Sequence, residues 1–360
     1  MQEIKLLKDA DVKGKRVLVR VDFNEPVKDG VVADDVRIKA VLPTIAYLRE
    51  HGAASIILLT HLARPTSPQD PSGDLTPIRT ALGALIDMQG IELHENLRFN
   101  PGEESNDPEF AKELAALGDV YVNDAFAASH REHASIVGVP KLLPSYAGLL
   151  MGREIAGLTP ALTPPPGALA IIGGAKFETK LHLIQKLLSQ YSELLLGGAL
   201  GNDIIKARGL PFGASIVSHE PVPIDVAIND RLMPPMDAVV MSGPGAEREA
   251  IIVDIRAEER IIDIGPATST LWAEKIAAAP FVLWNGPMGI YEEGYVDGTN
   301  VLAEALSKSP ARAVVGGGDT IAALTKHSFD AQKVFVSTGG GAMLDFLAHG
   351  TLPGLEALRN

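Results

Sequence analysis

Hydrophobic runs of strand length alternate with helical patterns along the whole chain. In the first half these runs cover residues 16–23, 54–62 and 118–126, and helical patterns such as 36–52 and 107–117 lie between them. In the second half the runs cover residues 168–175, 192–199, 280–287, 312–319 and 333–340. This alternation predicts an α/β protein in which βαβ units build parallel sheets.

Prolines interrupt the pattern near the middle of the chain. An apolar helical pattern that starts near residue 145 reaches Pro160, and Pro164, Pro165 and Pro166 follow. Proline stops helices, and prolines at this density form a semi-rigid joint. We therefore expect two domains, residues 1–158 and 159–347, joined by a hinge. The last residues, 348–360, are too few for a domain, and we expect them to dock elsewhere.

Composition and charge narrow the class of protein. The 360 residues are 46% hydrophobic and 21% charged, which is typical of a globular protein. The net charge is −13 and both halves are acidic, so we expect no nucleic-acid partner. The absence of cysteine excludes disulfides and thiolate catalysis. Because no run reaches 18 apolar residues and no signal-peptide pattern opens the chain, we expect a cytoplasmic protein with no membrane partner.

Glycines follow the hydrophobic runs of the second half. They are Gly173–Gly174, Gly197–Gly198, Gly286, Gly316–Gly318 and Gly339–Gly341. In open parallel sheets ligands bind beyond the carboxyl ends of the strands, where these glycines fall. Plain structural turns are one explanation; we favour a nucleotide site in which helix N-termini approach phosphates. The P-loop and the G-x-G-x-x-G fingerprint are both missing, which argues against a nicotinamide-dependent dehydrogenase.

Two lysines and an aspartate near these glycines fit a phosphate site. Lys176 and Lys180 are four residues apart, and we expect both amines on one face at the start of a helix. A pair of solvated lysines is the alternative. Asp319 follows three glycines, where it caps a helix or binds Mg²⁺ beside a nucleotide.

In the first half, acidic, amide and cationic side chains take the place of the glycines. One arginine alone is more often part of a surface ion pair. Several at one sheet edge of an acidic domain indicate a pocket for a small anion, because the planar guanidinium suits phosphate and carboxylate oxygens. The residues concerned follow three predicted strands or stand near helix starts and strand ends: Arg20, Asp22, Asn24, Arg37, His61, Arg64, Arg98, Asn123, Asp124, His130 and Arg131. A phosphate-binding half joined to an anion-binding half fits phosphoryl transfer, with closure excluding water.

Short segments along the chain can be compared with known families, namely "RVDFN", "DDVRIKAVLPTI", "THLARP", "ENLRF", "VNDAFAASHREHAS", "GGAKFETK", "WNGPMGIYE", "VVGGGDT", "VSTGGGAMLDFL" and "LPGLEAL". In their order, and over essentially the whole chain, these segments resemble the phosphoglycerate kinase family. The resemblance implies reversible phosphoryl transfer between 1,3-bisphosphoglycerate and MgADP, giving 3-phosphoglycerate and MgATP. It also implies a monomer of two Rossmann-like parallel-sheet domains, with residues 348–360 packed back on the first domain.

The resemblance also assigns the two sites. It places the phosphoglycerate site at Asp22, Asn24, Arg37, His61, Arg64, Arg98 and Arg131. It places the nucleotide site at Lys176, Lys180, Asn285, Glu292, Gly317, Gly318, Asp319 and Thr320, with Glu292 on the ribose and Asp319 serving the metal. For catalysis we expect Arg37 and Lys180 to act on the transferring group, together with the backbone N–H groups of Gly339 and Gly340.

Two departures from the family pattern affect loops near the phosphoglycerate site. Ala63 and Ala127 stand where the family usually has glycine, and alanine costs roughly 1–2 kcal/mol where φ must be positive. "GGALGNDIIKARG" also departs from the family pattern, which leaves the nucleotide base preference open. A non-catalytic protein that keeps the fold and binds nucleotide or an acidic metabolite is the alternative to the kinase.

Overall fold

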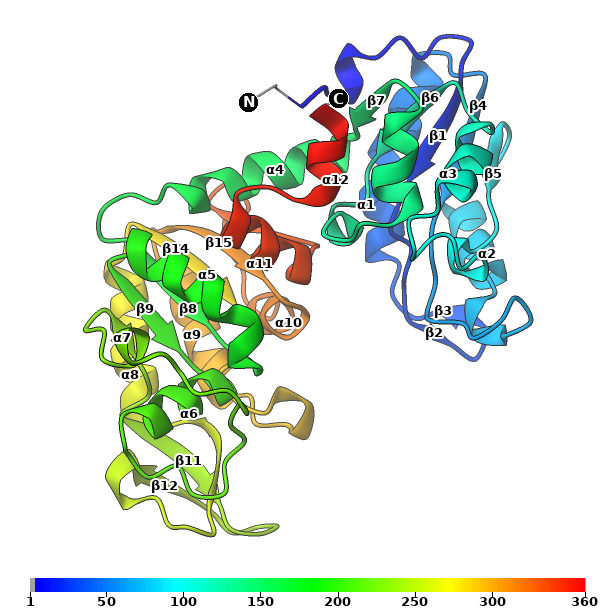
Figure 1. Ribbon diagram of the computed structural model, residues 1–360. Coiled ribbons are helices and arrows are strands. Elements are labelled where there is room, and N and C mark those ends of the chain that lie inside the picture. The colour runs from blue at the N-terminus through cyan, green and yellow to red at the C-terminus, as the bar shows by residue number, and fades with distance from the viewer. Residues whose placement is uncertain (1–3, 360) are drawn as a thin grey trace. The chain divides into compact units, whose positions relative to one another are not determined.

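The structure, a computed structural model, describes residues 4–359, and the chain divides into two compact units. The first unit is the chain up to Ala156 together with the segment from His349 onward, and the second is Gly157–Ala348. Figure 1 shows helices on both faces of a sheet in each unit. The units are described separately below.

A parallel five-stranded sheet, in the order β5-β4-β1-β6-β7, forms the centre of the first unit. β1 is buried from its second residue to its last because helices cover both faces of the sheet. The strands are β1 (Arg16–Arg20), β4 (Ser55–Leu59), β5 (Ile91–Leu93), β6 (Val120–Asn123) and β7 (Ser145–Ala147), with a separate hairpin of β2 (Val27–Lys28) and β3 (Val31–Val32).

Helix α3 of the first unit begins at residues that favour a helix start. In α3, Asp107 accepts hydrogen bonds from the N–H groups of Glu109 and Phe110, and Pro108 occupies the first helical position. The helices are α1 (Val36–Glu50), α2 (Thr76–Leu85) and α3 (Pro108–Ala115). Short helical turns are η1 (Leu7–Asp9), η2 (Pro71–Gly73), η3 (Leu97–Phe99), η4 (Phe126–Ala128), η5 (Ala134–Gly138) and η6 (Val139–Lys141).

Helix α4 (Leu149–Leu162) contains the boundary between the units. Our expectation that Pro160 ends the helix was wrong, since the helix continues two residues beyond it. The prolines that follow, from Pro164 to Pro166, lie outside the helix. The unit boundary therefore falls within a continuous helix, before the proline-rich segment.

The second unit contains a parallel six-stranded sheet in the order β10-β9-β8-β14-β15-β16. Its strands are β8 (Leu169–Ile172), β9 (Glu193–Leu196), β10 (Leu232–Met233), β14 (Phe281–Asn285), β15 (Arg312–Gly316) and β16 (Val334–Val336). The helices are α5 (Phe177–Gln190), α6 (Gly198–Ala207), α7 (Ile224–Ala227), α8 (Pro266–Ala278), α9 (Asp297–Lys308), α10 (Gly318–Leu324) and α11 (Gly340–His349), with turns η7 (Ile252–Asp254) and η8 (Tyr291–Glu293).

A second, antiparallel sheet of the order β12-β11-β13 adds to this unit and was not predicted. Its strands are β11 (Asp237–Met241), β12 (Glu247–Ile251) and β13 (Arg260–Ile264). β12 exposes most of its residues and carries alternating charges, so its sequence lacks the continuous apolar run that marks the parallel strands.

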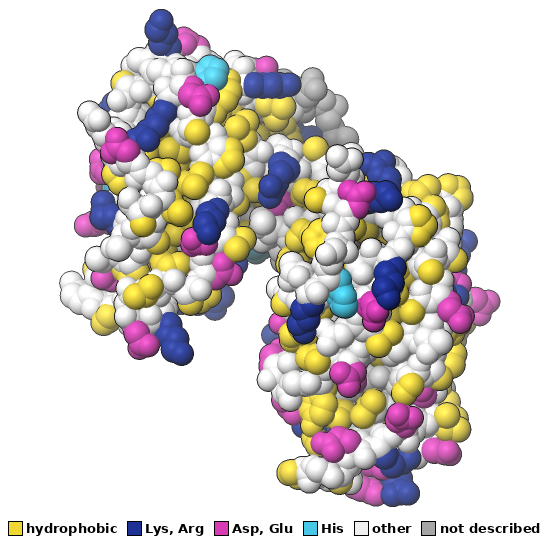
Figure 2. All heavy atoms as spheres, turned by 180° about the vertical axis from the view of Figure 1, so that it is seen from behind, with side chains coloured by type: hydrophobic (Ala, Val, Ile, Leu, Met, Phe, Trp, Pro, Cys, Tyr) yellow, Lys and Arg dark blue, Asp and Glu magenta, His cyan; other side chains and the backbone are white. Residues whose placement is uncertain are grey.

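The C-terminal segment packs on the first unit through α12 (Pro353–Glu356) and η9 (Ala357–Arg359). Leu352, Leu355 and Leu358 are buried, and the Gly354 N–H donates a 2.9 Å hydrogen bond to the Ser129 carbonyl. Among the described residues no helix is long and apolar enough to cross a membrane. Figure 2 shows acidic and basic side chains interspersed on the face it draws.

Candidate active site

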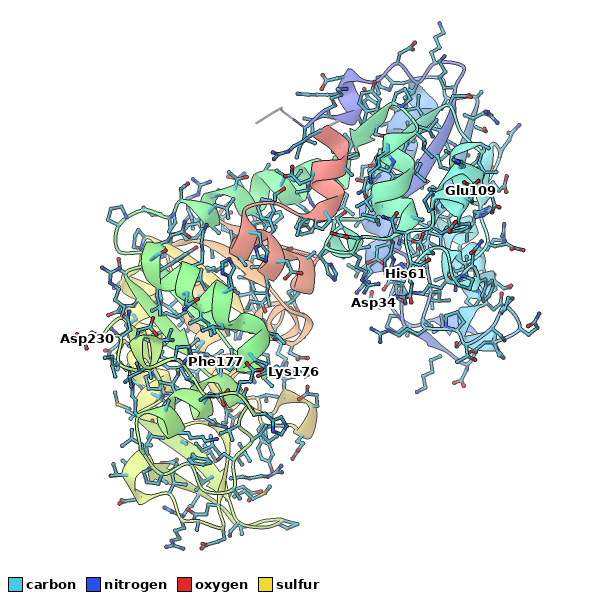
Figure 3. The ribbon with its side chains drawn as sticks, in the orientation of Figure 1. Asp34, His61, Glu109, Lys176, Phe177 and Asp230 are labelled. Atoms are coloured by element: carbon cyan, nitrogen blue, oxygen red, sulfur yellow. The ribbon has the colours of Figure 1, made fainter. Side chains whose placement is uncertain are left out.

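In the first unit, the predicted anion-binding side chains lie on loops that follow β1, β4 and β6. Asp22 and Asn24 follow β1, His61 and Arg64 follow β4, and Arg131 follows β6 and η4. Because these strands are parallel neighbours, their carboxyl ends share one edge of the sheet. Figure 3 labels His61 at this edge.

A cavity of about 690 Å³ opens among these loops. Its lining includes three of the predicted arginines and two histidines: Arg64, Arg98, Arg131, His130 and His133. Burial, together with the charges of neighbouring arginines, lowers the pKa of both Arg98 and Arg131. Cations half-buried beside one another repel, so an anion in this cavity would lower their electrostatic energy.

Acidic side chains partly compensate these cations. Glu104 forms an ion pair with Arg98, with 2.8 Å between Oε1 and Nε. Arg98 also donates to the Ala63 carbonyl, so the loop after β4 is fastened to η3. These two contacts fix the position of Arg98 at the wall of the pocket.

Arg37, in the first turn of α1, is held by carboxylates. Its Nη1 is 2.9 Å from Asp22 Oδ2, and its backbone N–H donates a 2.7 Å bond to Glu25 Oε1. Burial raises the pKa of Glu25, although the hydrogen bond and charge of Arg37 oppose this. Arg37 does not line the 690 Å³ cavity; 37% of its side chain is exposed, which leaves the guanidinium accessible.

Asn24 ties the loops after β1 and β4 together. Its Oδ1 accepts a 2.9 Å hydrogen bond from the Ala63 N–H, and Ala63 has a φ of +52°. The position therefore has the left-handed conformation that glycine adopts without strain. Ala127, in η4, does not have a positive φ, so alanine is unstrained there.

In the second unit, five glycine-bearing loops follow β8, β9, β14, β15 and β16 at one edge of the parallel sheet. Some of these glycines are needed because the loops pack so closely that a side chain would clash with a neighbouring loop. A Cβ on Gly173 would lie 2.0 Å from the Pro287 carbonyl oxygen, and one on Gly198 would lie 2.8 Å from the Gly174 nitrogen. By contrast, a Cβ on Gly318 or Gly341 would meet no atom within 4 Å, so these two leave space for a ligand.

A cavity of about 380 Å³ lies among these loops. It is lined by apolar and small residues together with Asn202, Arg260, Glu292 and Asp319. Of these, Glu292 and Asp319 were predicted, whereas Asn202 and Arg260 were not. Asn202 donates from Nδ2 to the Ile216 carbonyl at 3.1 Å, and Arg260 pairs with Glu293. A mostly apolar cavity with a few polar groups suits a nucleobase and ribose.

The two lysines do not share a helical face as we expected. Lys176 precedes α5 and has a φ of +65°, so the helical four-residue spacing does not apply to it. Figure 3 shows Lys176 and Phe177 where α5 begins. Lys180 lies in the first turn, and its Nζ donates a 2.6 Å hydrogen bond to the Ala175 carbonyl. Burial and the charge of Lys176 lower the pKa of Lys180. A strained residue and a desolvated amine mark this loop as a candidate for function.

The remaining predicted nucleotide residues differ in accessibility. Gly317, Gly318 and Asp319 lie at the start of α10, whereas the Thr320 hydroxyl is buried and has no hydrogen-bond partner among the described residues. Asn285 ends β14 and is also buried. Thr320 and Asn285 therefore support the loop from within.

The N–H groups of the triple glycine are only partly available. The Gly339 N–H donates to Ser337 Oγ at 3.2 Å, so it is partly engaged within its own loop, and its role toward the ligand stays a prediction. α11 begins at Gly340, and none of the three glycines has a positive φ. The N–H groups at the start of α11, from Gly340 onward, are the ones that can face an anion.

Asp319 is the candidate Mg²⁺ ligand. Burial and the nearby Glu292 carboxylate raise its pKa, and a cation there would relieve both effects. No group of three or more His, Cys, Asp or Glu side chains that could hold a metal occurs among the described residues. The donor set therefore fits Mg²⁺ that arrives with phosphates and takes one protein carboxylate.

Comparison with known proteins gives one consistent result. A family model described as "Phosphoglycerate kinase" matches residues 7–93 and 87–350. The chain is 41% identical to phosphoglycerate kinase of Roseiflexus sp. (strain RS-1), over 99% of both chains. It is similar in structure to phosphoglycerate kinase from Coxiella burnetii, with a TM-score of 0.86, 35% identity and 99% coverage of both chains. For the enzyme from Pyrococcus horikoshii OT3 the TM-score is 0.84 at 30% identity, covering 99% of this chain and 98% of that one.

Proposed function

Because the chain belongs to the phosphoglycerate kinase family, a family of phosphotransferases with a carboxyl acceptor in glycolysis, we propose how its residues perform this reaction. The reaction is reversible transfer between 1,3-bisphosphoglycerate and MgADP, giving 3-phosphoglycerate and MgATP. The observation that carries the proposal is the cavity of about 690 Å³ lined by Arg64, Arg98 and Arg131 in a chain of net charge −13.

The first unit binds the phosphoglycerate. Arg64, Arg98 and Arg131 hold its phosphate, since a guanidinium can give two parallel hydrogen bonds to phosphate oxygens. Asp22, Asn24 and His61 surround the glycerate part of the substrate. Asn24 also fixes the loop after β4. Arg37 is aimed by Asp22 and turns toward the transferring group when the substrate is bound.

The second unit binds the nucleotide. The apolar part of the 380 Å³ cavity takes the base, and Glu292 accepts from the ribose hydroxyls. Lys176, Lys180 and the N-terminus of α10, from Gly317 to Thr320, bind the phosphates, with Asn285 supporting them from beneath. Mg²⁺ bound by Asp319 and phosphate oxygens would neutralise charge on the phosphates.

The transfer itself needs no general base. The acceptor is a carboxylate, which is already ionised at neutral pH because such groups have a pKa near 4. Catalysis then consists of in-line positioning and neutralisation of the charge on the transferring group. We assign that neutralisation to Arg37, Lys180 and the Gly340 N–H, and we place the hinge bending that brings the ligands together at α4.

We place this enzyme in the cytoplasm as a monomer. The runner-up function is a protein that keeps the fold and binds the ligands without turnover. Retention of Arg37, Lys180 and Asp319 together favours the kinase, since binding alone does not need all three.

The experiment that tests the site assignment is calorimetric binding of each ligand alone. Arg131→Gln should weaken 3-phosphoglycerate at least tenfold and leave MgADP unchanged, and Asp319→Asn should do the reverse. Arg16→Gln serves as the control, because Arg16 pairs with Asp119 on the exposed start of β1. If Arg131→Gln and Arg16→Gln bind 3-phosphoglycerate equally well, the cavity is not the substrate site.

A further inference from the structure

A buried polar network lies behind the cavity of the first unit, and the reaction as proposed above does not use it. Arg20 ends β1, and it is fully buried although it carries a permanent charge. Ser135 in η5 and Glu103 are fully buried as well. Burying a charge costs free energy unless the charge is paired and hydrogen-bonded. The fully buried Arg20 therefore indicates a functional role for this network.

The Arg20 guanidinium is fixed from three directions. Nε donates to Ser135 Oγ at 2.9 Å, Nη1 donates to the Val21 carbonyl, and Nη2 lies 3.0 Å from His61 Nδ1. A planar guanidinium held at two of its nitrogens cannot rotate away from the third partner. Its position relative to the His61 ring is therefore set by the fold.

Ser135 and Glu103 anchor this guanidinium. Ser135 Oγ donates a 2.6 Å hydrogen bond to Glu103 Oε1, so an oxygen lone pair of Ser135 is left to accept from Arg20. The Ser135 N–H donates to Glu103 Oε2 at 3.0 Å, and Tyr121 on β6 donates to the Ser135 carbonyl at 2.6 Å. Glu103 thus balances the charge of Arg20 through the serine.

The contacts of His61 decide which ring nitrogen carries the proton. A guanidinium donates and never accepts, so Nδ1 at 3.0 Å from Arg20 must be the acceptor. The other nitrogen, Nε2, lies 3.4 Å from Arg131 Nη1, which is also a donor. Since the 3.0 Å contact is the better hydrogen bond, the hydrogen of a neutral ring belongs on Nε2.

The surroundings also keep the ring neutral. Burial lowers the pKa of His61, and so do the charged or titratable groups that face it from the neighbouring segments, Arg20, Arg98, Arg131 and His133. No acidic group contributes an opposing effect of comparable size. Nε2–H and the Arg131 guanidinium are then two adjacent donors for which the described part of the chain supplies no common acceptor, and Arg131 lines the cavity.

We propose that Arg20, anchored by Ser135 and Glu103, is a positioning residue that holds His61 as its neutral Nε2–H tautomer, so that His61 and Arg131 together donate to one anionic oxygen of the substrate. This inference rests on the proposed phosphoglycerate site. It assigns Arg20 no contact with the substrate.

The direct test uses the wild-type enzyme with ¹⁵N-labelled histidine, assigned by comparison with His61→Gln. The His61 signals should show the Nε2–H tautomer and should not titrate between pH 5.5 and 8. A hydrogen on Nδ1, or a titration midpoint near 6.5, would overturn the inference. The spectra do not depend on turnover. An inactive enzyme would therefore contradict the proposed function, whereas the His61 spectra alone decide this inference.

The second test uses Arg20→Lys and Ser135→Ala, with Arg16→Lys on the exposed start of the same strand as control. Loss of the fixed tautomer should raise KM for 3-phosphoglycerate about tenfold, leave KM for MgATP within about twofold, and make the His61 signals titrate. A purely structural role predicts lower stability with an unchanged His61 tautomer. That outcome, in either variant, would refute the positioning role.

Discussion

Ala63 offers a sharp test of the local geometry at the substrate site. Its φ of +52° costs an alanine roughly 1–2 kcal/mol relative to its preferred conformations. Replacement by glycine removes this strain. It also increases the entropy of the unfolded chain, which lowers the free energy of unfolding by about 0.4–1 kcal/mol. The Ala63→Gly variant should therefore be as stable as the parent or more stable, by up to about 1.6 kcal/mol.

Ala127→Gly is the matched control. Both alanines are half-buried. Ala63 lies in the loop after β4 and Ala127 in the turn after β6, and both strands flank β1, but Ala127 does not have a positive φ. It has no strain to lose, so glycine should cost about 0.5–1 kcal/mol there. The two variants should differ by about 1–2 kcal/mol, with Ala63→Gly the more stable.

The assay must report on the first unit, because both tryptophans, Trp272 and Trp284, lie in the second. Urea titrations followed by amide hydrogen exchange across β1 and β4 meet this need, since the Val21 N–H bonds to the Leu59 carbonyl between these strands. Equal destabilisation by the two substitutions would refute the strain at Ala63.

Three further predictions concern catalysis, pH and the glycine loops. Arg37→Ala and Lys180→Ala should each lower kcat at least tenfold, or about 1.4 kcal/mol, in a coupled assay, and a smaller loss would remove them from the transferring group. Burial raises the pKa of Asp124 from 3.8 to about 6, so its contribution to stability is full below pH 4 and is lost as the pH rises through 6. Asp124→Asn should therefore gain up to about 3 kcal/mol relative to the parent between pH 4 and 7, and parallel stability curves for the two proteins would contradict this. Gly173→Ala should lower the unfolding free energy by more than 2 kcal/mol because its Cβ would lie 2.0 Å from the Pro287 oxygen, whereas Gly341→Ala should not destabilise; equal melting curves would refute the loop packing.

The alternation of apolar and polar residues was enough to predict the parallel strands but not their ends. The predicted strand 312–319 ends at Gly316, and α10 starts at Gly318, because the glycines and Asp319 belong to the helix N-terminus. β12 escaped prediction because its residues alternate in charge and lie mostly on the surface. The helix end predicted at Pro160 was wrong, since α4 continues past this residue.

The place of polar residues after predicted strands was enough to single out most of the candidate site, including Lys176, Lys180 and Asp319, whereas Asn285, Glu292 and Thr320 came only from the resemblance to a family. Spacing suggested a shared face for Lys176 and Lys180, which the left-handed backbone at Lys176 excludes. The Arg20 network could not be read from the sequence, because Ser135 is 115 residues from Arg20 and Glu103 lies between them, 32 residues before Ser135. Arg20 gave only a weak signal, as a charged residue at the end of an otherwise apolar strand.

The most direct measurement of the central claim is ATP consumption in the presence of 3-phosphoglycerate and Mg²⁺, with the acyl phosphate trapped by hydroxylamine. We expect a hydroxamate signal that requires both substrates, disappears with EDTA, and falls at least tenfold in Lys180→Ala. A folded protein that binds 3-phosphoglycerate and MgATP but forms no hydroxamate would contradict the kinase and favour the non-catalytic binding protein.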